Sequence, residues 1–322
     1  MRKLIIQIPC LNEEKTLPST LSDLPKQVPG FDVVETLVID DGSTDNTVEV
    51  AQQCGVNHIL VLGKRCGLAR AFLAGLTRCL QLGADVIVHT DADNQYNAQD
   101  IPELVRPILE GRADIVVGAR PISEISYFSP VKKFLQFLGS AVMRHISHTP
   151  VADAPSGFRA YSKEAALRLN VFNPFTYTLE TLIQAGRQGL RVVNVPVRVN
   201  PKTRESRLFK GITGYVLRSI STMLRIYILY APMRFFLILA TPFLLGGVGF
   251  LCSWLYDYFF VTGEATQRIP ALIAGALCLL VSLQFFGLGV IADLLSKNRM
   301  LCEEIRYNQR RRMFLGEENQ MF

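Results

Sequence analysis

The chain has 322 residues, of which 49% are hydrophobic and 19% charged, so it has ample apolar material for a folded core. This composition excludes an intrinsically disordered or collagen-like protein. The net charge of +6 and the mean hydropathy of +0.23 favour a membrane surface over nucleic acid as the partner. The cysteines form no CxxC pair, so neither a zinc site nor a disulfide framework is predicted.

Over the first 200 residues, short β-branched runs alternate with segments of helical spacing. This alternation predicts an α/β fold with a mostly parallel sheet, in which ligands bind beyond the carboxyl ends of the strands. Ser43 or Thr44 is expected to cap the first helix. The predicted strands are 4–8, 36–40, 58–62, 85–89, 114–118 and 191–197, and the predicted helices are 44–54, 67–82 and 99–110.

Polar clusters follow three of the predicted strands, at the edge where a ligand is expected. They are 12–13, 40–43 and 91–93. Converging carboxylates repel one another unless a cation or hydrogen-bond donors offset their charge. The i, i+2 spacing of Asp91 and Asp93 puts both carboxylates on one side of an extended chain, and such oxygen ligands suit Mg²⁺ or Mn²⁺. Turns and helix caps produce the same spacing, so the pair alone does not identify a metal site.

The C-terminal third of the chain carries two uncharged apolar segments, 235–256 and 269–292. At ~1.5 Å per residue each is long enough to cross a ~30 Å hydrocarbon core, although buried helices of a soluble domain are the alternative. Several Lys and Arg residues lie before the first apolar segment and after the second, whereas the sequence between the two segments contains only one. Because positive residues favour the cytoplasmic side of a membrane, both termini are predicted to be cytoplasmic. Residues 213–230 have the pattern of an amphipathic helix, lying in the membrane interface or packed on the preceding domain.

Four parts of the chain are therefore predicted. An α/β domain covers 1–210 and an interface helix covers 211–232. Two transmembrane helices lie within 233–294, at about 235–256 and 269–292, and a basic cytoplasmic tail covers 295–322.

Five short motifs follow one another in an order typical of one enzyme family. Residues 8–14 (IPCLNEE), 38–45 (VIDDGSTD) and 91–95 (DADNQ) resemble the motifs of family 2 glycosyltransferases of the GT-A fold. Residues 118–120 (GAR) and 153–159 (DAPSGFR) are similar to the subgroup that includes dolichol-phosphate mannosyltransferase and bacterial polyprenyl-phosphate glycosyltransferases. The resemblance extends from residue 4 to about residue 210.

The resemblance implies roles for the matching residues. Pro9, Glu13 and Asp40 would hold the base and ribose of a nucleotide sugar. Leu11 departs from the tyrosine usual in the mannosyltransferase motif, which leaves both GDP and UDP donors open. Arg120 would meet a phosphate. The implied nucleotide-sugar ligands are Pro9, Leu11, Glu13, Asp40, Asp91, Ala92 and Arg120, and the implied metal ligands are Asp91, Asp93 and Gln95.

The acceptor side of the predicted site contains Asp153 and a basic loop. The resemblance makes Asp153 the catalytic candidate, in the position proposed as a base near the acceptor. A lipid phosphate with a second pKa of about 6 is already largely ionised, so Asp153 would orient the acceptor or stabilise positive charge on the sugar. The alternative is a structural partner of Arg159. In the basic loop 202–207, Arg204, Ser206 and Arg207 would bind the acceptor phosphate, or meet only acidic lipid.

The implied activity is that of a membrane-anchored inverting glycosyltransferase. It would move one sugar from a GDP- or UDP-sugar to polyprenyl phosphate with Mg²⁺ or Mn²⁺ as cofactor. The alternatives are another lipid or polysaccharide acceptor and a non-catalytic scaffold on the same fold. The predicted partners are the nucleotide sugar, polyprenyl phosphate and membrane lipid, with a homo-oligomer left open. None of the histidines is assigned a role, and His89 is expected in the core.

Overall fold

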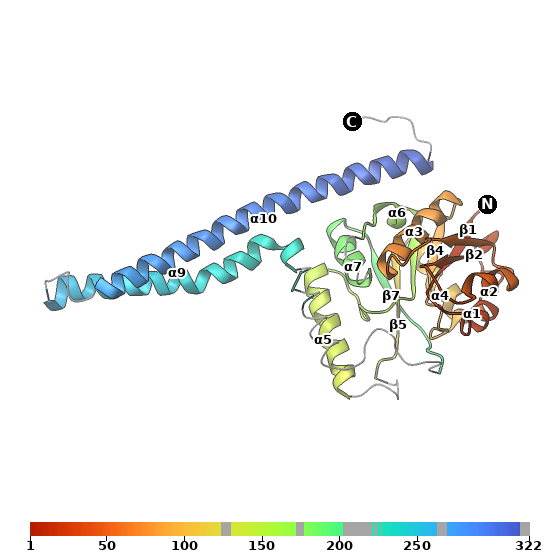
Figure 1. Ribbon diagram of the computed structural model, residues 1–322, viewed down its shortest axis with the longest axis horizontal. Coiled ribbons are helices and arrows are strands. Elements are labelled where there is room, and N and C mark those ends of the chain that lie inside the picture. Colours follow the sequence, from red (N-terminus) through yellow and green to blue (C-terminus); the bar gives the residue numbers. More distant parts are fainter. Residues whose placement is uncertain are drawn as a thin grey trace. The chain divides into compact units, whose positions relative to one another are not determined.

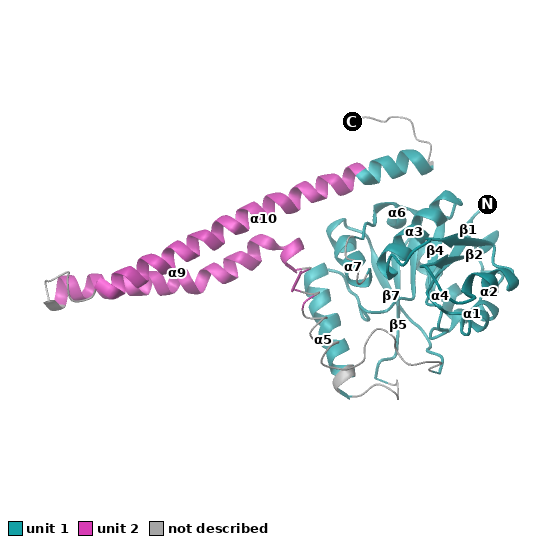
Figure 2. Cartoon of the chain, in the orientation of Figure 1, with its two compact units in different colours: residues 1–214, 306–322 teal, residues 215–305 magenta. Residues whose placement is uncertain are grey.

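The computed structural model (Figure 1) describes residues 1–123, 130–171, 177–201, 221, 224–225, 227–262 and 269–315. The chain forms two compact units, coloured separately in Figure 2. The first unit consists of residues 1–214 and 306–322, and the second of residues 215–305. The predicted acceptor residues Arg204, Ser206 and Arg207, and most of the predicted interface helix, lie outside the described residues.

The first unit is built on a seven-stranded sheet of order β3-β2-β1-β4-β6-β5-β7. Strand β1 pairs in parallel with β2 and β4, β2 with β3, and β5 with β7, whereas β6 is antiparallel to both of its neighbours. The predicted α/β fold with a mostly parallel sheet is therefore confirmed. The strands are β1 (Lys3–Cys10), β2 (Val33–Asp40), β3 (His58–Val61), β4 (Val86–His89), β5 (Ile115–Ala119), β6 (Arg159–Ser162) and β7 (Val192–Pro196).

Every strand except β6 coincides with a predicted run. Strand β6 has four residues, RAYS, and its arginine and serine hide the apolar pattern on which strand prediction rests. The helices of this unit are α1 (Leu17–Asp23), α2 (Thr47–Gln53), α3 (Leu68–Gln81), the 3-10 helix η1 (Ala98–Asp100), α4 (Ile101–Leu109), α5 (Pro130–Ser147), α6 (Lys163–Arg168) and α7 (Thr178–Arg187).

The predicted cap of the helix after β2 is wrong. Helix α2 begins at Thr47 with Asn46 in the N-cap position. The Ser43 hydroxyl instead accepts a hydrogen bond from the backbone N–H of Asn12, 2.9 Å away. Ser43 and Thr44 therefore belong to a loop contact with the segment after β1 and not to the helix.

The two faces of the sheet have different neighbours, because successive side chains of a strand point to opposite sides. Leu4, Ile6 and Ile8 of β1 belong to one buried apolar cluster with residues of α4. Gln7 contacts α3 on the other face, where a Cβ at Gly75 would clash with its Oε1 atom. Both faces are thus covered, and the polar loops lie at the carboxyl ends of the strands.

The second unit contains α9 (Pro232–Asp257), which continues into the π-helical η2 (Tyr258–Thr262), and most of α10 (Ile269–Leu315). Both α9 and α10 contain stretches of mean hydropathy 2.2 that are only 11% buried, so their length and composition would allow them to cross a membrane. The helices approach closely where a Cβ on Gly275 would lie 3.2 Å from the carbonyl oxygen of Gly247. Small residues at such a contact are typical of helices packed in lipid.

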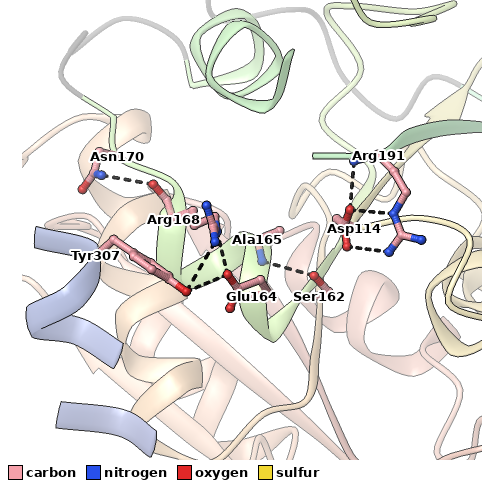
Figure 3. Close-up of polar contacts among 8 residues, drawn as sticks. All are labelled: Asp114, Ser162, Glu164, Ala165, Arg168, Asn170, Arg191 and Tyr307. Atoms are coloured by element: carbon pink, nitrogen blue, oxygen red, sulfur yellow. Dashed lines mark hydrogen bonds and ion pairs between the residues drawn. The ribbon is translucent and has the colours of Figure 1, made fainter. Parts of the chain in front are cut away.

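The last turns of α10 belong to the first unit and contact α6 (Figure 3). The Tyr307 hydroxyl donates a hydrogen bond to Glu164 Oε1 at 2.7 Å. The Arg168 guanidinium lies 4.4 Å from the centre of the Tyr307 ring and pairs with Glu164 at 2.6 Å. Arg310 Nη1 donates to the carbonyl oxygen of Leu169 at 2.9 Å. The segment predicted as a basic tail is therefore helical up to Leu315 and contacts α6 and the residue that follows it.

Candidate active site

Three polar segments meet at one edge of the sheet because β1 pairs with β2 on one side and with β4 on the other. The register places Cys10 beside Asp40 and Gln7 beside His89. The segments that follow these strands carry the predicted residues 11–13, 40–43 and 91–95. Parallel strands place their carboxyl ends together, which is where α/β sheets bind ligands.

The loops after β1 and β2 are joined by side-chain hydrogen bonds. Asn12 Oδ1 accepts from the Thr44 N–H at 2.7 Å, and Asn12 itself has a φ of 56°, which asparagine tolerates. The Asp40 carboxylate accepts from the N–H groups of Gly42 and Ser43 at 3.3 and 3.1 Å. Gly42 has a φ of 80°, and a Cβ there would lie 2.7 Å from a backbone nitrogen of the loop before α3. These contacts fix the backbone that carries the predicted base and ribose ligands.

The carboxylates of this edge differ in how they are held. Asp41 accepts from the backbone N–H groups of Cys66 and Gly67 at 2.7 and 2.9 Å, so it anchors the loop before α3. Glu13 and Asp40 are also buried. Burial, together with the nearby charges of Glu13 and Asp40, raises the pKa of the Cys10 thiol well above its ordinary value. The site is therefore acidic, and the Asp41 carboxylate has a structural role, because it already accepts two backbone hydrogen bonds.

The segment after β4 carries Asp91 and Asp93. The Asp91 side chain is 34% exposed, and Asp93 Oδ1 accepts from the backbone N–H of Gln95 at 3.2 Å. Ala92 is buried, and its carbonyl oxygen accepts from the Thr20 hydroxyl at 2.9 Å. Among the described residues no three His, Cys, Asp or Glu side chains form a metal-holding group. Two carboxylates and an amide oxygen still fit Mg²⁺ or Mn²⁺, because these ions take their remaining ligands from water and substrate phosphates.

The acidic loop is tied to the chain that leads into the basic loop. The Asn200 N–H donates to the carbonyl oxygen of Gln95 at 2.9 Å, and Asn200 Nδ2 donates to the carbonyl oxygen of Asn94 at 3.0 Å. Arg198 pairs with Asp100 at 2.6 Å. Residue 200 is thus held beside the acidic loop, two residues before the predicted basic loop begins.

Asp153 forms a buried ion pair with Arg120. Arg120 Nε donates to Asp153 Oδ2 at 2.7 Å and Nη2 donates to Oδ1 at 3.0 Å, with the two side chains 8% and 1% exposed. Burial alone would lower the pKa of Arg120, but the negative charge of neighbouring groups, including Asp153, raises it above its ordinary value. Both oxygens of Asp153 therefore already accept hydrogen bonds from a guanidinium group.

The alternative that Asp153 is a structural partner of Arg159 is wrong. Arg159 is fully buried and donates to the carbonyl oxygens of Ala154, Ser156 and Thr178 at 2.7 to 2.9 Å. It thereby holds the backbone of the segment that contains Asp153. The sequence alone could not show which arginine pairs with Asp153, because the partner, Arg120, lies 33 residues upstream.

One feature of the site was missed in the sequence. Tyr96 follows the acidic loop, its ring lies 6.0 Å from Arg120 Cζ, and its hydroxyl accepts from the Gly157 N–H at 3.0 Å. It thus connects the acidic loop to the segment after Asp153. The expectation that His89 lies in the core is confirmed. His89 is fully buried at the end of β4, and burial, aided by the positive charge of Arg159, lowers its pKa to about 3. Its imidazole is therefore neutral at physiological pH.

The chain is similar in sequence to a known protein family and to named members of it. The family model described as Glycosyl transferase family 2 matches residues 5–169. An undecaprenyl-phosphate mannosyltransferase of Micrococcus luteus is 32% identical in an alignment of 225 positions that covers 66% of this chain and 90% of that protein. A UDP-N-acetylglucosamine–dolichyl-phosphate N-acetylglucosaminyltransferase of Methanococcus voltae is 28% identical over 212 residues, 59% of this chain and 83% of that protein.

A solved structure shares the fold. Glucosyl-3-phosphoglycerate synthase from Mycobacterium tuberculosis, in complex with Mn²⁺, uridine diphosphate and phosphoglyceric acid, has a TM-score of 0.51 and 23% identity. The match covers 71% of this chain and 76% of that one. The region matched by the family model contains all three acidic segments and the Arg120–Asp153 pair.

Removing either partner of this buried pair leaves the other charge without its counterion. We expect Arg120→Met and Asp153→Asn each to lower the free energy of unfolding by about 3 to 5 kcal/mol. The measurement is chemical denaturation of the purified protein in neutral detergent. The double variant should lose less than the sum of the two single losses, because it leaves no unpaired charge.

The exposed pair of Arg191 with Asp114 is the matched control (Figure 3). It has the same two-bond geometry, at 3.0 Å for both contacts, but Arg191 is 57% exposed. Arg191→Met should therefore change stability far less, because water screens an exposed pair. Equal losses for Arg120→Met and Arg191→Met would contradict the structural importance of the buried pair.

Proposed function

The chain belongs to glycosyl transferase family 2, and we propose that it transfers one sugar from a nucleotide diphosphate sugar to polyprenyl phosphate at a membrane. The family resemblance of its motifs is confirmed, and the chain is a glycosyltransferase. One observation carries the choice of acceptor: the similarity extends over 90% of an undecaprenyl-phosphate mannosyltransferase. Two apolar helices follow the matched region, which suits an acceptor whose tail stays in the bilayer.

The donor would bind at the ends of β1 and β2. We propose that Pro9, Glu13 and Asp40 hold the base and ribose. Pro9 and Asp40 lie at the ends of β1 and β2, and Glu13 lies on the loop after β1, which Asn12 joins to the loop after β2. Leu11 lies on the same loop, and both GDP- and UDP-sugars remain candidate donors. The named relatives differ in the sugar that they transfer, which is mannose for one and N-acetylglucosamine for the other.

The diphosphate would bind near the acidic loop. Asp91, Asp93 and Gln95 would hold Mg²⁺ or Mn²⁺, with Ala92 next to the donor. A bound divalent ion there would offset the negative charge that develops on the departing diphosphate. The exposure of Asp91 supports this role, because a ligand of an incoming metal–diphosphate pair must be accessible.

The acceptor phosphate would react without a general base. A phosphate oxygen forms the bond to the anomeric carbon while the bond from that carbon to the diphosphate breaks, and the diphosphate leaves with the electron pair. The nucleophile is largely ionised at neutral pH, because its second pKa is about 6. Since both oxygens of Asp153 accept from Arg120, we propose that Asp153 holds Arg120 toward a phosphate and does not remove a proton.

The basic loop would complete the acceptor site. Asn200 is bonded to the acidic loop, so Arg204 follows that anchor by four residues. This short tether supports the proposal that Arg204, Ser206 and Arg207 bind the acceptor phosphate. Arginine is suited to this role, because its guanidinium makes paired contacts to phosphate oxygens.

The proposed reaction is tested with purified protein in neutral detergent. We expect one sugar to be added to a short-chain polyprenyl phosphate from at least one member of a panel of GDP- and UDP-sugars, in the presence of Mg²⁺ or Mn²⁺. Mass spectrometry of the lipid product measures the transfer. Asp93→Asn should lower turnover by about 100-fold or more, because it removes a proposed ligand of the divalent ion whose charge would stabilise the leaving diphosphate.

Two controls separate the parts of this proposal. Polyprenol without its phosphate should accept no sugar, and excess EDTA should stop transfer. Absence of a lipid product with every donor would contradict the proposed acceptor. Full turnover after verified metal removal would overturn the metal requirement alone.

The basic loop makes a second prediction. Arg204→Ala and Arg207→Ala should each remove a charge-assisted contact worth about 1.5 to 3 kcal/mol, lowering kcat/KM for polyprenyl phosphate by about 10- to 150-fold. Lysine should restore only part of the loss. Neutral detergent is required, because anionic lipid would add an attraction of its own.

Arg225→Ala is the matched control, since it removes an equal charge from the helix that follows the loop. It should leave kcat/KM within about twofold of the parent protein. Unchanged values for both loop variants would leave the loop as a contact for acidic lipid.

We also propose that both termini and the first unit face the cytoplasm. The positive charges at the outer ends of the two apolar helices support this orientation. In single-cysteine variants, the exposed Cys54 and Cys302 should react with an impermeant maleimide in inverted membrane vesicles and not in intact cells. Thr266→Cys, in the connection between the spans, should give the reverse pattern. Labelling of Cys302 from outside would refute the topology.

A further inference from the structure

Gln7 and His89 form a buried polar pair within the sheet. They are register partners on β1 and β4, and neither is exposed to solvent. Burying an amide and an imidazole costs free energy unless each polar atom finds a partner. Nothing in sheet formation requires polar residues at these positions, since Ile5 and Ile87 on the same two strands are buried and apolar.

The contact between the two side chains determines where the imidazole proton lies. Gln7 Nε2 is 3.1 Å from His89 Nδ1, and an amide nitrogen can only donate. His89 Nδ1 is therefore the acceptor, and the neutral ring carries its proton on Nε2. With the amide reversed, Nδ1 would carry the proton and the lone pair of Nε2 would face the Asp91 carboxylate, which is repulsive.

His89 Nε2 lies near the acidic loop. It lies 4.0 Å from Asp91 Oδ1 and makes no hydrogen bond to any described residue. The imidazole is clamped by two aromatic rings, Phe72 at 5.1 Å and Tyr177 at 4.9 Å between ring centres. Gly75 leaves the space that Gln7 occupies, because a side chain there would clash with the amide. The ring is thus held from three sides, with Nε2 4.0 Å from one carboxylate oxygen.

We propose that His89 is a positioning residue whose Nε2–H orients the Asp91 carboxylate in the donor complex, and that Gln7 fixes the imidazole for this purpose. The inference rests on the proposed donor-binding role of Asp91. A small rotation of Asp91 closes the 4.0 Å separation to a hydrogen bond, as catalytic contacts often do when substrate binds. A neutral donor suits the task, because a lysine or arginine there would neutralise the charge that Asp91 presents to the donor.

The test is a double-mutant cycle in which His89→Phe fills the ring volume without an N–H. His89→Phe should lower kcat/KM for the donor by about 10- to 150-fold, in line with the loss of one hydrogen bond to a charged group. Added to Asp91→Asn, the same change should cost less than about twofold more, since the group it orients is already altered. Full additivity of the two effects would overturn the proposal.

A binding measurement without turnover gives an independent readout. Calorimetry with GDP-mannose and UDP-N-acetylglucosamine, in the absence of acceptor, should show the same loss and the same non-additivity in Kd. His89→Gln should retain part of the affinity, because its amide N–H can reach the position of Nε2. Gln7→Leu should weaken binding in the same direction as His89→Phe, and serves as the second variant if His89→Phe does not fold. Normal donor affinity in a folded Gln7→Leu protein would also overturn the proposal.

Tyr161→Phe is the matched control. It removes a buried hydroxyl from the same aromatic cluster, 5.6 Å from Phe72 between ring centres, and should leave donor affinity unchanged. If Asp91→Asn itself leaves donor affinity and kcat/KM unchanged, the proposed role of Asp91 fails and this inference fails with it. If Asp91→Asn is impaired and His89→Phe is either harmless or additive, only the positioning role is wrong.

Discussion

The parallel pairing of β1 with β2 and β4 determines where the charges of the site lie. Each of these strands ends in a polar segment, so their alignment gathers Glu13, Asp40 and Asp91 at one edge of the sheet. Negative charges gathered in this way repel one another and destabilise the fold unless donors face them. Backbone N–H groups face Asp40 and Asp41, and their geometry requires the left-handed conformation of Gly42. Much of the local loop structure is thus explained by the need to offset charge.

The buried arginines Arg120 and Arg159 have different partners. Arg159 donates to backbone carbonyl oxygens and stiffens the segment after Asp153. Arg120 instead pairs with Asp153, and the pair has no net charge. Its guanidinium fork is fixed by two bonds, so in the role proposed for it Arg120 would offer a phosphate an oriented donor and not a flexible side chain. Asp91 differs from these groups in being one-third exposed, which fits a residue that acts on a ligand.

Local sequence patterns predicted most of the fold, because the runs that form the parallel strands are almost wholly apolar. They missed β6, since a buried arginine interrupts its pattern, and they misplaced the start of α2, since Ser43 bonds to Asn12 from another loop. The same limit applies to the site. The motifs pointed to the acidic segments, but the pairing of Asp153 with Arg120 and the contact of Gln7 with His89 join residues 33 and 82 positions apart. Only the folded chain shows that these residues meet.

The contact of Tyr307 with α6 makes the first unit discontinuous along the chain. Its last helical piece is separated from residue 214 by the whole of the second unit, including both apolar helices. During synthesis, Glu164 and Leu169 therefore leave the ribosome long before Tyr307 and Arg310 exist to cover them. At ~5 to 20 residues per second, adding the 143 residues from Glu164 to Tyr307 takes on the order of 7 to 29 seconds. The first unit would thus acquire its final packing only after the second unit has been synthesised, so that its assembly is ordered in time by the order of the two units along the chain.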